Sequence, residues 1–113
     1  MRSVQGELVL PDAVQEPHAD RVLIEVRDVS LADAPSTVVA STVLEDVPLT
    51  PQGVIEFELD APDAEPGHTL ALSVHVDIDG SGAIGAGDLI TTVHVPVPAS
   101  GPVGDVSVPL TQL

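Results

Sequence analysis

The chain contains no cysteine, no tryptophan, no tyrosine and no lysine. The absence of cysteine excludes disulfide bonds, thiolate zinc sites and cysteine nucleophiles, and it leaves the redox compartment open. Because Phe57 is the one aromatic residue, a core must be built from valine, leucine, isoleucine and alanine. Valine dominates this set, and β-branched side chains suit a pleated surface better than a helix. The composition therefore favours strands.

Positive charge is scarce as well: 18 acidic residues stand against three arginines, which gives a net charge of −15. Nucleic acids and anionic membranes would repel such a chain, so the charge argues against both as partners. A solvated acidic surface is the simplest interpretation. Adaptation to a salty environment and cation binding are also consistent with it.

Long apolar runs are missing too, since no segment approaches the roughly 18 consecutive apolar residues of a membrane span. The N-terminal residues enter a strand-like pattern at once and show neither a signal peptide nor a lipidation cysteine. We therefore expect a cytoplasmic protein if the chain is complete, and an extracytoplasmic one if a leader has been removed.

What the chain does have is a series of short runs in which apolar and polar residues alternate, separated by residues typical of turns. The run 54–59 is the clearest example, with Ile55, Phe57 and Leu59 on one face. No segment shows sustained helical periodicity, so helix should be scarce. The predicted strands are 3–10, 21–29, 37–45, 54–59, 69–77, 89–97 and a last run around 106–110. At 113 residues, this pattern predicts a single all-β domain over 1–113, with seven strands in two packed antiparallel sheets.

The segment 77–88, DIDGSGAIGAGD, has the spacing of a calcium-coordinating loop. Calcium takes six to eight oxygen ligands, and EF-hand-type loops of twelve residues supply them from fixed positions. Side-chain oxygens come from positions 1, 3 and 5, a backbone carbonyl from position 7, and the closing carboxylate from position 12. The predicted calcium ligands are therefore Asp77, Asp79, Ser81, Ala83 through its carbonyl, and Asp88.

Two other positions of this loop fit the same pattern. Gly82 at position 6 permits the sharp turn, because it has no Cβ to clash, and Ile84 at position 8 is expected to anchor the loop to the core. Asp88 at position 12 replaces the commoner glutamate, as in dockerin modules, which the loop resembles over its twelve residues. Because a strand-like run follows instead of a helix, we expect the loop at the tip of a β-hairpin, with calcium in a structural role. The alternative is a flexible acidic hairpin loop without a metal.

The chain carries no catalytic signature, and we expect a protein that is not an enzyme. Paired carboxylates such as Glu56 and Glu58 lie on alternating runs and are best explained as solvated. No Gly-x-Ser-x-Gly elbow occurs, and the glycine-rich loop lacks the lysine of a phosphate-binding loop. His75 and His94 flank the loop and are predicted to face outward as surface residues; the alternative is a transition-metal site, since the two could approach one another across the hairpin.

In the segment 26–40, VRDVSLADAPSTVVA, a strand-like run ends in a turn that leads into a β-branched run. The turn residues resemble those of the YbaY-type lipoprotein domain family, which is related to the YscW pilotins, lipoprotein chaperones of type III secretion. The residues that match are Asp28, Val29, Ser30, Ala32, Asp33, Ala34 and Pro35. The opening VQGELVLP and the region from Ile55 to about Pro98 fit the family's other strands.

This resemblance implies an immunoglobulin-like β-sandwich and a non-catalytic protein, and it supplies no catalytic residues. The chain departs from the family's lipoproteins in lacking a lipobox cysteine and in its longer acidic loop. Two function hypotheses follow. The first is a β-sandwich module that binds calcium in the loop 77–88, with the ion mainly structural. The alternative is a secretion- or envelope-associated, pilotin-like chaperone that binds a protein partner, with the loop incidental.

Overall fold

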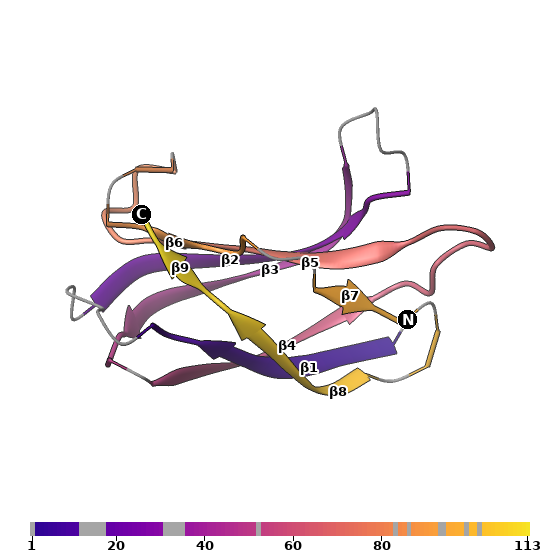
Figure 1. The fold of residues 1–113 in the computed structure, drawn as a ribbon, viewed down its shortest axis with the longest axis horizontal. Coiled ribbons are helices and arrows are strands. Elements are labelled where there is room, and N and C mark those ends of the chain that lie inside the picture. Colours follow the sequence, from indigo (N-terminus) through magenta and orange to yellow (C-terminus); the bar gives the residue numbers. More distant parts are fainter. Residues whose placement is uncertain are drawn as a thin grey trace.

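All the regular secondary structure in the described part of the chain is β-strand, and no helix there could span a bilayer (Figure 1). A computed structural model describes residues 2–11, 18–30, 36–51, 53–82, 84–85, 87–92, 95–98, 100–101 and 103–113. The strands within these ranges are β1 (Arg2–Val9), β2 (His18–Asp28), β3 (Thr37–Pro48), β4 (Val54–Ala61), β5 (Leu70–Asp77), β6 (Leu89–Ile90), β7 (Pro96–Val97), β8 (Val103–Pro109) and β9 (Thr111–Gln112). The prediction of an all-β protein in two sheets is confirmed.

The strands form one sheet in the order β4-β1-β8 and a second in the order β3-β2-β5-β6-β9, with β7 also pairing with β5. The two sheets lie one over the other in Figure 1. The C-terminal segment runs from β8 in the first sheet to β9 in the second, and Leu110 between them donates its N–H to the Val9 carbonyl. One continuous cluster of buried apolar residues joins both sheets.

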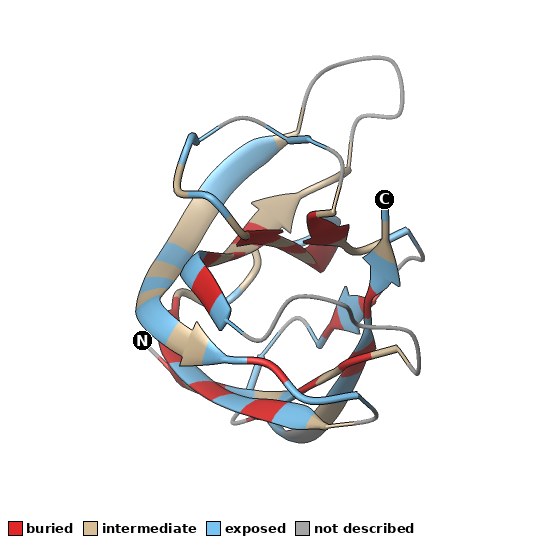
Figure 2. Cartoon of the chain, turned by 90° about the vertical axis from the view of Figure 1, so that its left-hand side faces the viewer, coloured by how far each residue is buried: buried red, intermediate tan, exposed pale blue. Residues whose placement is uncertain are grey.

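The alternation read from the sequence determines which side chains enter this cluster. Along β4 every second residue is buried, which appears in Figure 2 as alternating bands. In β2, Val22, Ile24 and Val26 have no exposed surface. The predicted inward residues of β5 are buried too: they are Leu70, Leu72, Val74 and Val76. Packing relies on branched aliphatic side chains, as the shortage of aromatic residues requires.

The strand count differs from the prediction, because nine strands occur among the described residues instead of seven. The expected run 89–97 becomes β6 and β7, which pair with opposite ends of β5. Between them, the Thr91 side-chain hydroxyl accepts the Val74 N–H, so a side chain interrupts the backbone ladder. The last expected run lies in β8, and the short strand β9 follows it after Leu110, where the chain changes sheets.

The expectation of purely antiparallel sheets is wrong for one pair, because β1 and β8 run parallel. These strands lie near opposite ends of the chain, so a crossover long enough for parallel pairing is available. Their register shifts between Val4 and Gly6. At Gly6 the strands approach so closely that an added Cβ would lie 2.2 Å from the Val106 carbonyl oxygen. A glycine is therefore required where the two ends of the chain meet.

Candidate functional site

The loop 77–88 connects β5 to β6, which pair antiparallel through Val76 and Leu89. The predicted placement at the tip of a hairpin is therefore correct. Asp77 and Asp88 lie at the base of this hairpin and are only 3% and 2% exposed. Two carboxylates are thus held away from solvent in a chain with little positive charge.

The Asp77 carboxylate organises the first half of the loop. Its Oδ1 accepts the N–H of Gly80 at 3.1 Å, and its Oδ2 accepts the N–H of Gly82 at 2.7 Å. Gly82 has a φ of 82°, in the left-handed region that favours glycine, as the sequence predicts for the sharp turn. Asp79 in turn accepts the N–H of Ser81 at 3.1 Å, and hydrogen bonds from Ser81 lower the pKa of Asp79.

The Asp88 carboxylate organises the second half of the loop. Its Oδ1 accepts the N–H of Ile78 at 3.1 Å, while its Oδ2 accepts the N–H of Gly85 at 3.1 Å and lies 2.8 Å from Nε2 of His75. Burial acts to raise the pKa of Asp88, but the hydrogen bonds from His75, Ile78 and Gly85 together outweigh it and lower the pKa. The carboxylate therefore stays ionised at neutral pH and fixes both ends of the loop.

The structure brings together part of the predicted calcium site. Potential ligand atoms of His75, Asp77 and Asp88 all lie within 4.8 Å of one another. Asp79 and Ser81 are exposed farther along the loop, and Ala83 lies outside the described residues. Two buried carboxylates beside an imidazole can bind a cation, and oxygen atoms from the loop can complete its coordination.

Two sequence-based expectations about this region are wrong. Ile84 does not anchor the loop, because its side chain is 62% exposed. His75 is not a surface residue, since its side chain is only 15% exposed and is hydrogen-bonded to Asp88. Alternation correctly places His75 on the same face of β5 as Asp77, but only the fold of the loop brings Asp88 to it. His94, the other histidine that flanks the loop, lies outside the described residues.

A second polar cluster involves the turn after β2. The Asp28 Oδ1 accepts the N–H and the hydroxyl of Ser30, and its Oδ2 is paired with Nδ1 of His68. The Ser30 hydroxyl oxygen accepts the N–H of Thr69 at 2.8 Å, and Val29 donates its N–H to the Thr69 carbonyl. This network joins the end of β2 to the start of β5.

The network gives an architectural role to Asp28 and Ser30 in the turn that carries the family resemblance. The other part of that turn, Ala32 to Pro35, lies outside the described residues. Hydrogen bonds from Ser30 and His68 lower the pKa of Asp28 to about 2, and the bond with Asp28 raises the pKa of His68. Sequence reasoning gave His68 no role, because its partner is 40 residues away and no local pattern links them.

This network predicts a measurable pH dependence. The stabilising effect of the lowered Asp28 pKa is present above 3.8 and is lost as the pH falls through about 2. The effect of the raised His68 pKa is present below 6.5 and is lost as the pH rises through its folded-state value. The pair of Asp28 and His68 should therefore contribute most to the free energy of unfolding between pH 3.8 and pH 6.5.

We expect Asp28→Asn to return the His68 pKa toward 6.5 in an NMR titration, because the substitution removes the carboxylate that raises it. Asp60→Asn, which alters an exposed residue of β4, is the matched control and should leave the His68 titration unchanged. An unshifted His68 in the native protein would show that the ion pair does not form.

Comparisons with known proteins bear on the whole chain. A search of curated proteins finds no match. Among solved structures, the fold is similar to that of an alternative pilotin from the type II secretion system of Vibrio cholerae, with a TM-score of 0.64 and 24% sequence identity over 99% of this chain and 98% of that one. A family model described as type III secretion system lipoprotein chaperone (YscW) matches residues 1–103. The chain therefore belongs to the YscW family of type III secretion system lipoprotein chaperones.

Proposed function

We propose that the protein is a pilotin-like chaperone that binds a protein component of a secretion system in the cell envelope, outside the cytoplasm. The match to the YscW family over residues 1–103 carries this proposal. The likeness of fold to a pilotin over 99% of the chain supports it. In this proposal residues 1–113 form one immunoglobulin-like sandwich with no catalytic role, and the protein acts through its surface.

The polar clusters of the chain are consistent with a binding role. Asp28, Ser30 and His68 are engaged in a network that joins two strands, and Asp88 is engaged in fixing its loop. The Ser30 hydroxyl donates to Asp28 and accepts the N–H of Thr69, so it takes part in holding β2 and β5 together. Both clusters are thus engaged in holding the fold together.

The test is a quantitative binding assay between the purified chain and soluble fragments of each envelope component of a secretion system from the same cell. One component should bind with saturation, and the binding should survive a calcium chelator. An unrelated acidic protein of similar net charge is the control for nonspecific attraction. If no component binds above this control, the proposed chaperone function is wrong.

A second role concerns the loop 77–88, which we propose binds calcium with a structural effect. The proposed ligands remain Asp77, Asp79, Ser81, the Ala83 carbonyl and Asp88. The proximity of the buried Asp77 and Asp88 carboxylates supports it, because a divalent cation between them would offset their repulsion. His75 provides a nitrogen at the same position, so the assay should include zinc as a competitor.

Calorimetry should show heat when millimolar calcium is added to chelator-treated protein. If calcium binds only the folded state, a free concentration 100 times the dissociation constant raises the free energy of unfolding by about 2.7 kcal/mol. Asp79→Asn should weaken calcium binding with little change in the metal-free protein, since Asp79 is exposed. Asp60→Asn, the control, should change neither calcium binding nor the stability of the metal-free protein. An absence of heat in the native protein would rule out the calcium site.

A further inference from the structure

The least protected edge of either sheet is β3. It ends the six-stranded sheet and pairs with β2 alone among the described strands. At twelve residues it is as long as any described strand, and no charged residue occurs from Thr37 to Leu44. Val38 and Val43 are 41% and 45% exposed. A long, weakly charged edge of this kind presents unpaired backbone N–H and C=O groups to solvent.

The other described edges are protected in ways that β3 is not. Three exposed acidic residues, Glu56, Glu58 and Asp60, alternate along β4. The other edge of the three-stranded sheet, β8, carries Asp105 and ends at Pro109, which has no N–H to donate. In the six-stranded sheet, β7 and β9 are each only two residues long. Short edges and charged side chains are the usual devices against unwanted strand pairing. The contrast indicates that β3 is the edge left available for pairing.

Irregularities confine the available part of β3 to residues 40–45. At one end, the register with β2 shifts between Val26 and Arg27. At the other end, Asp46 has a φ of 51°, which turns the backbone out of the extended conformation. Between them, the pairing with β2 is regular from Ala40 to Glu45. This length suits a short extended segment.

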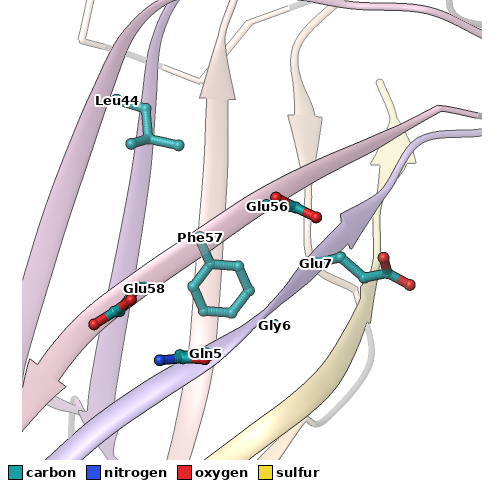
Figure 3. A pocket seen from close by; sticks show the side chains of 7 residues that line it. All are labelled: Gln5, Gly6, Glu7, Leu44, Glu56, Phe57 and Glu58. Atoms are coloured by element: carbon teal, nitrogen blue, oxygen red, sulfur yellow. The ribbon is translucent and has the colours of Figure 1, made fainter.

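A pocket beside this edge adds side-chain selectivity. It has a volume of about 540 Å³ and is lined by both sheets, with Leu44 from β3 and Phe57 from β4 (Figure 3). Three acidic residues, Glu7, Glu56 and Glu58, also line it. No lysine occurs in the chain, and no arginine lines this pocket. An apolar group flanked by positive charge would complement the lining.

We propose that β3 binds an extended polypeptide segment by strand addition along residues 40–45, and that this segment alternates apolar and basic residues. The inference rests on the proposed chaperone function, for which it names the binding surface and the chemistry of the partner. Backbone hydrogen bonds provide affinity, and the pocket with its carboxylates selects the sequence. A second copy of the chain fits poorly, because each copy carries a net charge of −15.

The test uses two synthetic eight-residue probes, one alternating valine with lysine and the other alternating valine with glutamate. Binding of the valine–lysine probe should slow hydrogen exchange at every second backbone amide between Ala40 and Glu45, because alternate N–H groups point away from β2. The valine–glutamate probe should bind at least about tenfold more weakly. Equal binding of both probes, or exchange that is unchanged along β3, would overturn the proposal.

Variants on opposite edges of the same sheet provide the second readout. Val43→Lys should weaken binding of the valine–lysine probe, and Val43→Glu should not. Both substitutions remove the apolar contact of Val43, but lysine also repels the basic probe, whereas glutamate attracts it. Leu113→Lys makes the same charge change at the exposed C-terminal residue beyond β9 and should have no effect. Weaker binding by Val43→Glu together with concentration-dependent dimers would identify self-association instead, and would contradict the proposed partner.

The two proposals fail separately. If a secretion-system component binds but the exchange of β3 is unchanged, the chaperone function stands and this surface is wrong. If the valine–lysine probe protects β3 but no component binds, the surface stands and the chaperone function is wrong.

Discussion

Replacing Gly6 with alanine should lower the free energy of unfolding by about 3 kcal/mol, at the upper end of the usual range for overpacking. The added Cβ would lie 2.2 Å from the Val106 carbonyl oxygen, and this backbone atom cannot rotate away as a side chain can. β8 would have to move from β1, which would disturb the packing of the fully buried Val108. Denaturant unfolding monitored by circular dichroism measures the loss.

Gly104→Ala is the matched control for this substitution. It lies in β8 as well, but a Cβ there meets nothing within 4 Å. Alanine at this position should leave stability unchanged or raise it by up to about 1 kcal/mol, because it restricts the unfolded chain. If Gly6→Ala and Gly104→Ala gave the same unfolding free energy, the close parallel contact between β1 and β8 would be wrong.

Asp88→Ala should lower the free energy of unfolding by about 2 to 4 kcal/mol, because it leaves several polar groups without their hydrogen-bond partner. The N–H groups of Ile78 and Gly85 and the imidazole of His75 all depend on this carboxylate. The loss should persist in the presence of a chelator, since these hydrogen bonds need no metal. Asp60→Ala, which removes an exposed carboxylate from β4, is the control and should change stability by less than about 0.5 kcal/mol.

The pH dependence of this difference gives a second measurement. Because the folded protein lowers the pKa of Asp88, the stability from its ionised form is present above the ordinary value of 3.8 and is lost as the pH falls through the lowered value. Unfolding free energies of the native protein and of Asp88→Ala should therefore converge in acid. A gap that stays constant as the pH falls would mean that the ionised carboxylate is not what fixes the loop.

Much of the secondary structure follows from local patterns in the chain. Alternation identified the inward faces of β4 and β5, and the glycine and aspartate spacing of 77–88 placed a loop at a hairpin tip. Side-chain direction in a strand has a period of two, so sequence neighbours alone determine it. The turn containing Asp28 and Ser30 also indicated the family, although not what those side chains contact.

The remaining features depend on which strands become neighbours, and no local period encodes that. The parallel pairing of β1 with β8 joins the two ends of the chain, and the pairs Asp28–His68 and His75–Asp88 form across strands and loops. Ile84 illustrates the limit: its position suits an anchor, yet the folded loop turns it to solvent. The sequence by itself determined most of the longer strands, the acidic loop and the shortage of cations. Only the tertiary structure decided the strand order, and with it which edge stays open, because pairing energy is shared between segments far apart in the chain.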